Sequence, residues 1–157
     1  MPSKRLTDYL DQNNIKYTTL KHSLAYTAQE IAAVAHIPGK NLAKTVMVNV
    51  KGKLAMAVLP ASNKIDFDQL KQALGTDAVR ISHEKEFLNL FPDCEVGAMP
   101  PFGNLYGMEV YVAQSLSEDK EIAFNSCTHS ELIQMKYKDF KKLVKPKVIR
   151  FSFQSKL

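Results

Sequence analysis

The chain of 157 residues has no tryptophan and only two cysteines, Cys94 and Cys127. These cysteines lie far apart and lack the paired spacing of a zinc site or a redox motif, so we expect free thiols and neither a metal centre nor a disulfide framework. No apolar run approaches the ~18 residues that span a bilayer, and the N-terminus lacks the apolar stretch of a signal peptide. These absences favour a cytoplasmic protein without a membrane segment.

Familiar catalytic signatures are missing as well. Gly39-Lys40 is followed by Asn41 and lacks the upstream glycine of a phosphate-binding P-loop, which argues against nucleotide hydrolysis. The chain has no Gly-x-Ser-x-Gly elbow, and its 4 histidines include no pair at metal-ligand spacing. We therefore expect no bound metal or cofactor, and any chemistry must come from a less conventional set of residues.

No internal repeat, low-complexity tract or Gly/Ser-rich linker divides the chain, so we expect a single domain over residues 1–157. Mostly apolar and β-branched residues at 42–50 and 54–59, joined by the turn Lys51-Gly52, predict a β-hairpin. Hairpin-like strands with helices between them indicate an α/β class with a mixed, mostly antiparallel sheet that is curved or barrel-like and surrounded by helices. Further strands are predicted at 79–81, 108–112, 121–124 and 132–135.

Helix ends are predicted from capping residues. Thr27 is expected to cap a helix, and Asp66 is expected to cap another that ends at Gly75. Ser82 is expected to cap a helix that stops before Pro92. Apolar spacing predicts further helices at 6–10 and 139–144.

Positive charge is concentrated near the C-terminus. The formal net charge is +5, and the residues from Lys136 to Arg150 include seven basic side chains and one acid, Asp139. Such a concentration attracts anions and can bind a phosphate backbone with release of counterions. The alternative is a solvated helix face with no partner.

Lys44 is unusual because it lies inside an apolar strand. Strand alternation places it on the same face as Leu42 and Val46, where a cation is costly unless it lies at the end of the strand or meets a negative partner. If the strand begins late, the ammonium group simply reaches water. The alternative is a lysine that projects into a cleft and holds an anionic phosphate or a developing oxyanion.

Two later segments combine backbone control with polar groups. In residues 97–103, Pro100 and Pro101 fix the backbone while the flanking glycines permit torsions that are closed to other residues. This loop can direct backbone N–H and C=O groups at a ligand, although a surface turn is the alternative. Residues 125–129, Asn-Ser-Cys-Thr-His, form a polar cluster after a predicted strand, and a lone histidine there is also compatible with an ordinary hydrogen-bonded residue.

These segments together resemble a known family. The YbaK-type aminoacyl-tRNA deacylase superfamily, which comprises the free-standing relatives of the editing domain in bacterial prolyl-tRNA synthetases, has successive blocks similar to residues 43–46, 58–61, 97–103 and 124–129. The resemblance extends over nearly the whole chain, and the Gly-x-x-Pro-Pro-Phe-Gly loop is its most specific part. It implies hydrolysis, without metal or cofactor, of the ester that joins a small, mischarged amino acid to tRNA.

The resemblance also implies roles for particular residues. Lys44 is the expected catalytic residue, positioning the terminal adenosine and the reacting ester. The concentration of positive charge, and not the resemblance, is the reason to expect Lys141, Lys142 and Lys145 to contact the tRNA backbone. The residues expected to bind the aminoacyl group are Thr45, Gly97, Pro100, Pro101, Phe102, Gly103, Asn125, Cys127, Thr128 and His129.

One position departs from the family. Relatives usually carry Asn-Ala-Gly-Thr-His at residues 125–129, so Cys127 replaces a glycine and adds a Cβ and a sulfur to the expected pocket. We expect altered amino-acid specificity, with the thiol in a packing role in preference to that of a nucleophile. The alternative function is a catalytically weak or inactive module that binds aminoacyl-tRNA or a small ligand, with an aminoacyl-tRNA synthetase as a candidate partner.

Overall fold

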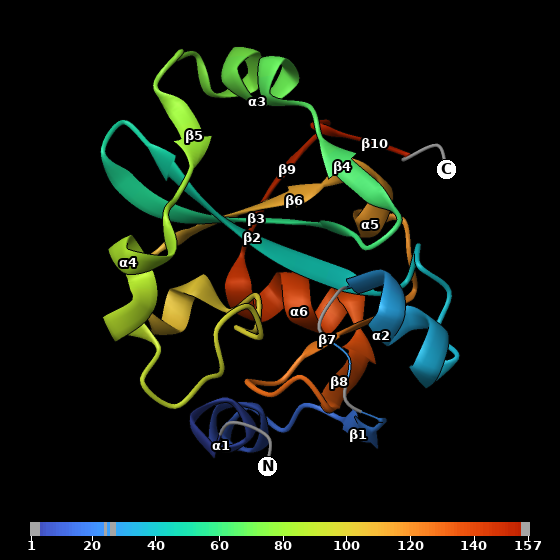
Figure 1. Cartoon of the computed structure of the whole chain (residues 1–157). Helices are drawn as coiled ribbons and strands as arrows, with labels where there is room; N and C mark the ends of the chain where they lie inside the picture. The colour runs from blue at the N-terminus through green and yellow to red at the C-terminus, as the bar shows by residue number, and fades with distance from the viewer. Residues whose placement is uncertain (1–3, 24, 26–27, 155–157) are drawn as a thin grey trace.

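A mixed five-stranded sheet forms the centre of the computed structural model, which describes residues 4–23, 25 and 28–154 (Figure 1). Strands β2 and β3 pair as the predicted hairpin, and β5 adds to β2 in the antiparallel sense. β6 and β9 continue the sheet beyond β3 in the parallel sense. The order of its strands is β5 (Val79–Ile81), β2 (Ala43–Val50), β3 (Lys53–Pro60), β6 (Glu109–Ala113) and β9 (Lys147–Ile149).

Two smaller antiparallel sheets complete the strand structure. One has the order β1 (Tyr17–Lys21), β8 (Glu131–Lys136) and β7 (Glu121–Asn125), and the other pairs β10 (Ser152–Gln154) with β4 (Asn63–Ile65). A parallel bridge between Leu42 and Ala123 joins the start of β2 to β7, and the backbone N–H of Ala123 donates to the Asn41 carbonyl at 3.0 Å. The first residues of β2 therefore lie beside the strand that leads into the polar cluster 125–129.

Helices cover both faces of the central sheet. In Figure 1, α3 lies on one side of it, and α6 lies on the other side with β7, β8 and α1. Both faces are buried, because Met56 and Val58 on β3 belong to one core cluster and Leu59 on the same strand belongs to another. Among the described residues, no helix is long and apolar enough to cross a membrane. The helices are α1 (Lys4–Gln12), α2 (Ala28–Ala35), α3 (Phe67–Leu74), α4 (Glu84–Phe87), α5 (Gln114–Ser117) and α6 (Tyr137–Val144), with 3-10 turns η1 (Leu88–Leu90) and η2 (Gly103–Leu105).

The α/β class and the mixed sheet are confirmed, and local signals placed several elements correctly. The side chain of Asp66 accepts a hydrogen bond from the Gln69 N–H, and Gly75 ends α3 at a φ of 67°. The expected cap at Ser82 is wrong by one residue: α4 begins after His83, whose backbone N–H donates to the carboxylate of Glu86. The predicted cap at Thr27 lies outside the described residues.

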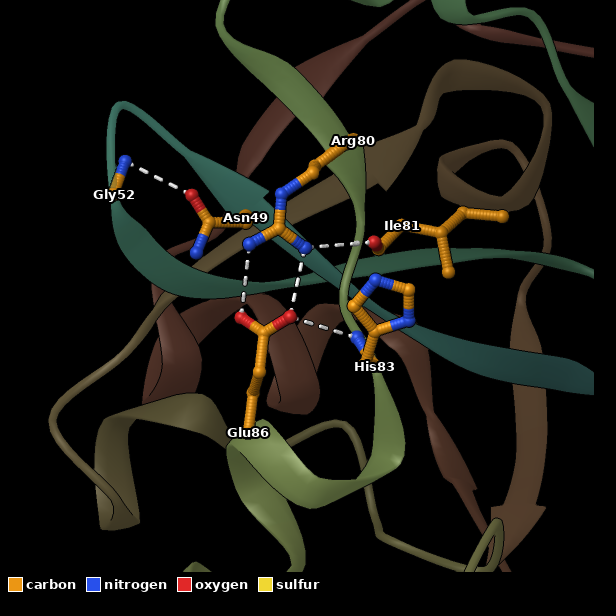
Figure 2. Close-up of polar contacts among 6 residues, drawn as sticks. All are labelled: Asn49, Gly52, Arg80, Ile81, His83 and Glu86. Atoms are coloured by element: carbon orange, nitrogen blue, oxygen red, sulfur yellow. Dashed lines mark hydrogen bonds and ion pairs between the residues drawn. The ribbon is translucent and has the colours of Figure 1, made fainter.

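An ion pair between Arg80 and Glu86 joins β5 to α4. Figure 2 shows the guanidinium group of Arg80 facing the carboxylate of Glu86, with N···O distances of 2.7 and 3.1 Å. The backbone N–H of His83 donates to the same carboxylate at 3.0 Å. In the same view, the side chain of Asn49 accepts from the N–H of Gly52 at 2.9 Å and closes the β2–β3 turn. These contacts stabilise β5 and the β2–β3 turn, which lie near the last residues of β2 and away from its start.

We expect the Arg80–Glu86 pair to make the stability of the folded protein depend on pH in the acid range. The hydrogen bonds from Arg80 and from the His83 N–H lower the pKa of Glu86 from its ordinary value to about 2. Because the folded-state pKa is lowered, the pair's contribution is complete above the ordinary glutamate range and is lost as pH falls toward 2. A carbon-13 NMR titration should show this low midpoint, and Arg80→Ala should return it toward the ordinary value. Arg150→Ala is the matched control, and a wild-type midpoint near 4.5 would contradict the prediction.

Candidate functional site

Lys44 is a half-buried cation near the start of β2. It is the second residue of the strand, and its backbone is opposite Leu59 of β3. Within the described part of the chain, no hydrogen bond or ion pair neutralises its ammonium group, whereas Lys64 on β4 is close enough to repel it. Burial and then this repulsion lower the pKa of Lys44. An uncompensated cation beside a second cation favours an incoming anion.

The loop 97–103 and the polar cluster 125–129 are brought together by backbone contacts. The N–H of Cys127 donates to the Ala98 carbonyl at 2.9 Å, and the N–H of Glu95 donates to the Cys127 carbonyl at 2.8 Å. The Nε2–H of His129 donates to the Val96 carbonyl at 2.8 Å, which fixes this ring nitrogen as the protonated one. Residues 95–98 and 125–129, about 30 residues apart in sequence, therefore lie side by side, and we call these two segments the wall.

Three oxygens in the polar cluster are buried without a hydrogen-bond partner among the described residues. They are Oδ1 of Asn125, Oγ of Ser126 and Oγ1 of Thr128. Buried polar atoms in native proteins are nearly always satisfied, because leaving one unpaired costs free energy. Such a concentration in one loop is suited to a polar ligand that supplies the missing partners. Thr45, on the strand beside this loop, is half-buried opposite Val58.

The second half of the expected pocket loop is part of the core. Pro100 and Pro101 are buried, and Phe102 is 0% exposed, with its ring centroid 5.5 Å from that of Phe124 and 5.4 Å from that of Phe140. At Gly103, an added Cβ would lie 2.7 Å from the Val110 side chain and 2.9 Å from a backbone oxygen. Phe102 and Gly103 thus support the wall by packing. Gly97 is different, because it is exposed, has a φ of 84° and lies next to the ring of His129.

The expectation of free thiols was wrong. Cys94 and Cys127 form a disulfide across 33 residues, and the described residues include no free cysteine. Sequence spacing could not reveal this bond, because it depends on the loop contacts that bring the two segments together. A carboxylate oxygen of Asp93 also lies within 4.8 Å of both sulfurs. Because the two sulfurs are bonded to each other, neither is available as a thiolate ligand, and this group of three residues does not form a metal site while the disulfide is present.

Cys127 has a φ of 69°, in the left-handed region that glycine adopts freely. This backbone conformation fits the glycine that the resemblance leads one to expect at this position. The cysteine keeps the same backbone conformation and is 1% exposed, so its sulfur points toward Cys94 within the wall. The structure assigns the cysteine a cross-linking role, which the sequence did not reveal.

The basic segment lies on α6 and the residues that follow it. α6 buries Tyr137, Phe140 and Val144, and its solvent-facing side is basic. Lys145 ends the helix in a left-handed conformation with a φ of 52°. All seven basic side chains of the segment, Lys136, Lys138, Lys141, Lys142, Lys145, Lys147 and Arg150, are exposed. The charge is therefore available to a partner, but it is carried by a different part of the chain from Lys44.

Two residues near the site were missed by sequence reasoning. Cys94 carried no motif, and Lys64 lies on a three-residue strand that the sequence did not predict. β4 contacts β3 of the hairpin, and this tertiary contact places Lys64 where its charge affects Lys44. Lys44, which has no neutralising partner among the described residues, lies on a strand whose start is bridged to β7, and the loop after β7 carries the buried polar atoms without partners. This combination has the character of a site for an anionic or ester-containing ligand.

Residues 22–143 match the aminoacyl-tRNA editing domain family, and the chain belongs to this family. The chain is 27% identical to the multifunctional Ser/Thr-tRNA deacylase ProXp-y of Escherichia coli strain K12, with 94% of the chain and 91% of that protein covered. These similarities confirm the resemblance seen in the sequence.

Solved structures share the fold. A hypothetical protein, APE2540, has a TM-score of 0.84 at 18% identity, covering 96% of this chain and 100% of that one. A protein proposed to be a trans-editing enzyme for prolyl-tRNA synthetase has a TM-score of 0.79 at 18% identity, with 96% of each chain covered. At these identities the similarity shows a common architecture only.

Proposed function

We propose that the protein is a trans-editing aminoacyl-tRNA deacylase that hydrolyses the ester of a small, mischarged amino acid. The observation that carries this proposal is Lys44, a half-buried ammonium for which the described residues supply no counter-ion, on the strand whose start is bridged to β7, the strand that leads into the polar cluster 125–129. Membership of the editing-domain family and the deacylase relative support the same activity. The proposed setting is the cytoplasm, with aminoacyl-tRNA as the partner and no metal or cofactor.

In the proposed reaction, water attacks the ester carbonyl and the ribose oxygen leaves. Lys44 holds the substrate and stabilises negative charge as it develops on the oxygens of the reacting ester. The wall formed by Gly97 and residues 125–129 fixes the aminoacyl group so that attack is effectively unimolecular. Lys44 acts as a positive charge in this scheme, so it must remain protonated. Because its pKa is lowered, activity is expected to decline with rising pH earlier than an ordinary lysine would allow.

Selectivity for a small amino acid is proposed to come from the same wall. The unsatisfied oxygens of Asn125 and Thr128 can accept a hydrogen bond from a substrate hydroxyl, or Thr128 can donate one. Serine and threonine carry such a hydroxyl and are named in the description of the E. coli relative. A site built to pair with a hydroxyl discriminates strongly against analogues that lack it, since its own polar atoms would then stay unpaired.

A panel of charged tRNAs tests this function. Single-turnover hydrolysis of alanyl, seryl, threonyl and prolyl esters on their cognate and non-cognate tRNAs should show acceleration for a subset of the small amino acids. The spontaneous hydrolysis rate of each ester supplies the baseline. Binding of aminoacyl-tRNA without acceleration of any ester would replace the proposal with the alternative of a binding module.

The basic segment is proposed to hold the tRNA backbone without taking part in the chemical step. Replacing Lys141, Lys142 and Lys145 by alanine should reduce the slope of log affinity against log salt by roughly two to three, since each phosphate contact contributes ~0.7–0.9. The rate at saturating tRNA should not change. Filter binding or fluorescence anisotropy over a series of salt concentrations measures the slope.

A control of equal charge change is the exposed triple variant Lys51→Ala, Lys53→Ala and Lys85→Ala. Its salt slope should stay near that of the wild type if binding depends on position as well as on total charge. Equal slopes for the wild type and the Lys141, Lys142 and Lys145 variant would show that this face is only solvated.

A further inference from the structure

The Cys94–Cys127 disulfide connects two segments of the proposed site. Cys94 lies three residues before Gly97, and Cys127 lies between Asn125 and His129. Hydrogen bonds join the same two segments on both sides of the sulfurs: Glu95 to Cys127 at 2.8 Å, Cys127 to Ala98 at 2.9 Å and His129 to Val96 at 2.8 Å. We call residues 94–98 and 127–129, held by these contacts, the clamp. The disulfide is its single covalent link.

The backbone at Cys127 makes this link important for the shape of the wall. A φ of 69° is costly for a residue with a Cβ, although it is free for glycine. Without the cross-link, the chain at Cys127 can relax toward more favourable torsions. Its neighbours Asn125 and Thr128, which carry the unsatisfied buried oxygens, would then shift with it. A change at the sulfurs is therefore transmitted directly to the polar side of the proposed pocket.

We propose that Cys94 is a positioning residue and that the thiol–disulfide state of the clamp controls substrate binding at the site. This inference rests on the proposed deacylase function. With the disulfide formed, the clamp holds the wall in its assembled shape. With the bond reduced, the wall loosens and the aminoacyl group is held less well. Disulfides in reducing compartments are typically transient and redox-sensing, which suits control of this kind.

The two cysteines differ in exposure, and this difference indicates which of them an external thiolate attacks. Cys94 is half-buried, whereas Cys127 is 1% exposed. The thiolate of an external dithiol attacks Sγ of Cys94, and the Cys127 thiolate leaves and takes up a proton. The second thiol of the reductant, as its thiolate, then attacks its partner sulfur in the mixed disulfide and releases Cys94. The protein gains two electrons and two protons, and the dithiol becomes a cyclic disulfide. Reoxidation by a low-molecular-weight disulfide reverses these steps.

Kinetics of the full-length protein in both redox states test the proposal. The wild type is equilibrated with dithiothreitol or with oxidised glutathione, and its free thiols are counted by mass spectrometry after alkylation. Reduction should lower kcat/KM for the preferred aminoacyl-tRNA by about tenfold, since misplacement by an ångström can cost ~100-fold. The loss should appear mainly as a higher KM, because Lys44 lies on a separate strand. A bond that served only global stability would leave the KM of the folded protein unchanged.

Cys94→Ser is the matched variant, assayed in the same two buffers. It should show the kinetics of the reduced wild type in both, which also corrects for any effect of the reagents on the assay. Equal kcat and KM for the oxidised and reduced wild type would overturn the proposal. A redox response that persists in Cys94→Ser would also overturn it, because the response would then not depend on this bond.

A structural readout separates failure of this proposal from failure of the proposed function. Hydrogen exchange of the Glu95 and Cys127 amides, which bond across the clamp, should be faster after reduction and faster in Cys94→Ser. If no ester is hydrolysed in either state, the deacylase function fails, and faster exchange still supports a clamp held by the disulfide. Unchanged exchange of both amides would refute the clamp whatever the activity.

Discussion

Lys44→Ala should abolish measurable deacylation, with a loss of at least about 100-fold in the single-turnover rate, because removal of one preorganised electrostatic contact typically costs ~10²–10³. The Lys44 side chain is half-buried, and among the described residues no partner offsets the free-energy cost of removing its charge from water. Its removal should therefore leave the melting temperature unchanged or slightly raised. Circular dichroism and rapid-quench kinetics measure the two effects separately.

Two further variants show whether the charge at this position has to be a lysine. Lys44→Arg keeps the charge but should remain poor, since a planar guanidinium group does not fit the place of a compact ammonium. Lys53 is an exposed lysine on the neighbouring strand β3, and the variant Lys53→Ala should retain wild-type activity. If Lys44→Ala hydrolyses the ester at the wild-type rate, the catalytic assignment is wrong, and the cation is merely tolerated at the start of the strand.

Phe102→Ala should lower the free energy of unfolding by about 3–5 kcal/mol, the usual cost of deleting a large buried aromatic side chain. The ring is fully buried, packs between Phe124 and Phe140, and meets Tyr9 edge-on at a centroid distance of 6.3 Å. These contacts join the loop 97–103 to β7, α6 and α1, so the cavity would open where several elements meet. Urea denaturation followed by circular dichroism measures the loss.

Phe153→Ala is the control for this substitution, because Phe153 is 50% exposed. Its effect should stay within about 0.5 kcal/mol, as for most surface changes. Phe102→Leu should retain most of the stability, since it preserves much of the apolar volume. If Phe102→Ala folds as stably as the wild type but hydrolyses a different set of esters, then Phe102 is a pocket residue and the packing role is wrong.

Local sequence determined those elements whose signals lie within a few residues. Two runs of mostly apolar and β-branched residues and the Lys51-Gly52 turn between them define the β2–β3 hairpin. Asp66 and Gly75 set the ends of α3, because each satisfies backbone groups of that helix directly. The motif resemblance to the editing-domain family was also available from sequence, and the match over residues 22–143 confirms it.

Tertiary structure decided the features that depend on distant contacts. The short strands β4, β9 and β10 were not predicted from the sequence, and each is held in the structure by the strand that pairs with it. The burial of Phe102 also depends on distant partners, since its loop looks like an exposed turn until β7 and α6 pack around the ring. Lys64 affects Lys44 only because β4 folds back toward the hairpin.

The disulfide is the clearest case of this division. The two cysteines are far apart in sequence and belong to no paired motif, so their spacing predicted two free thiols. A bond across 33 residues requires both Cα atoms to come within a few ångströms, here 4.1 Å. The contacts that achieve this are the backbone hydrogen bonds between Glu95, Cys127 and Ala98, which no local pattern encodes. Sequence thus determined which side chains this part of the molecule contains, and packing of the two loops decided that Cys94 and Cys127 would meet.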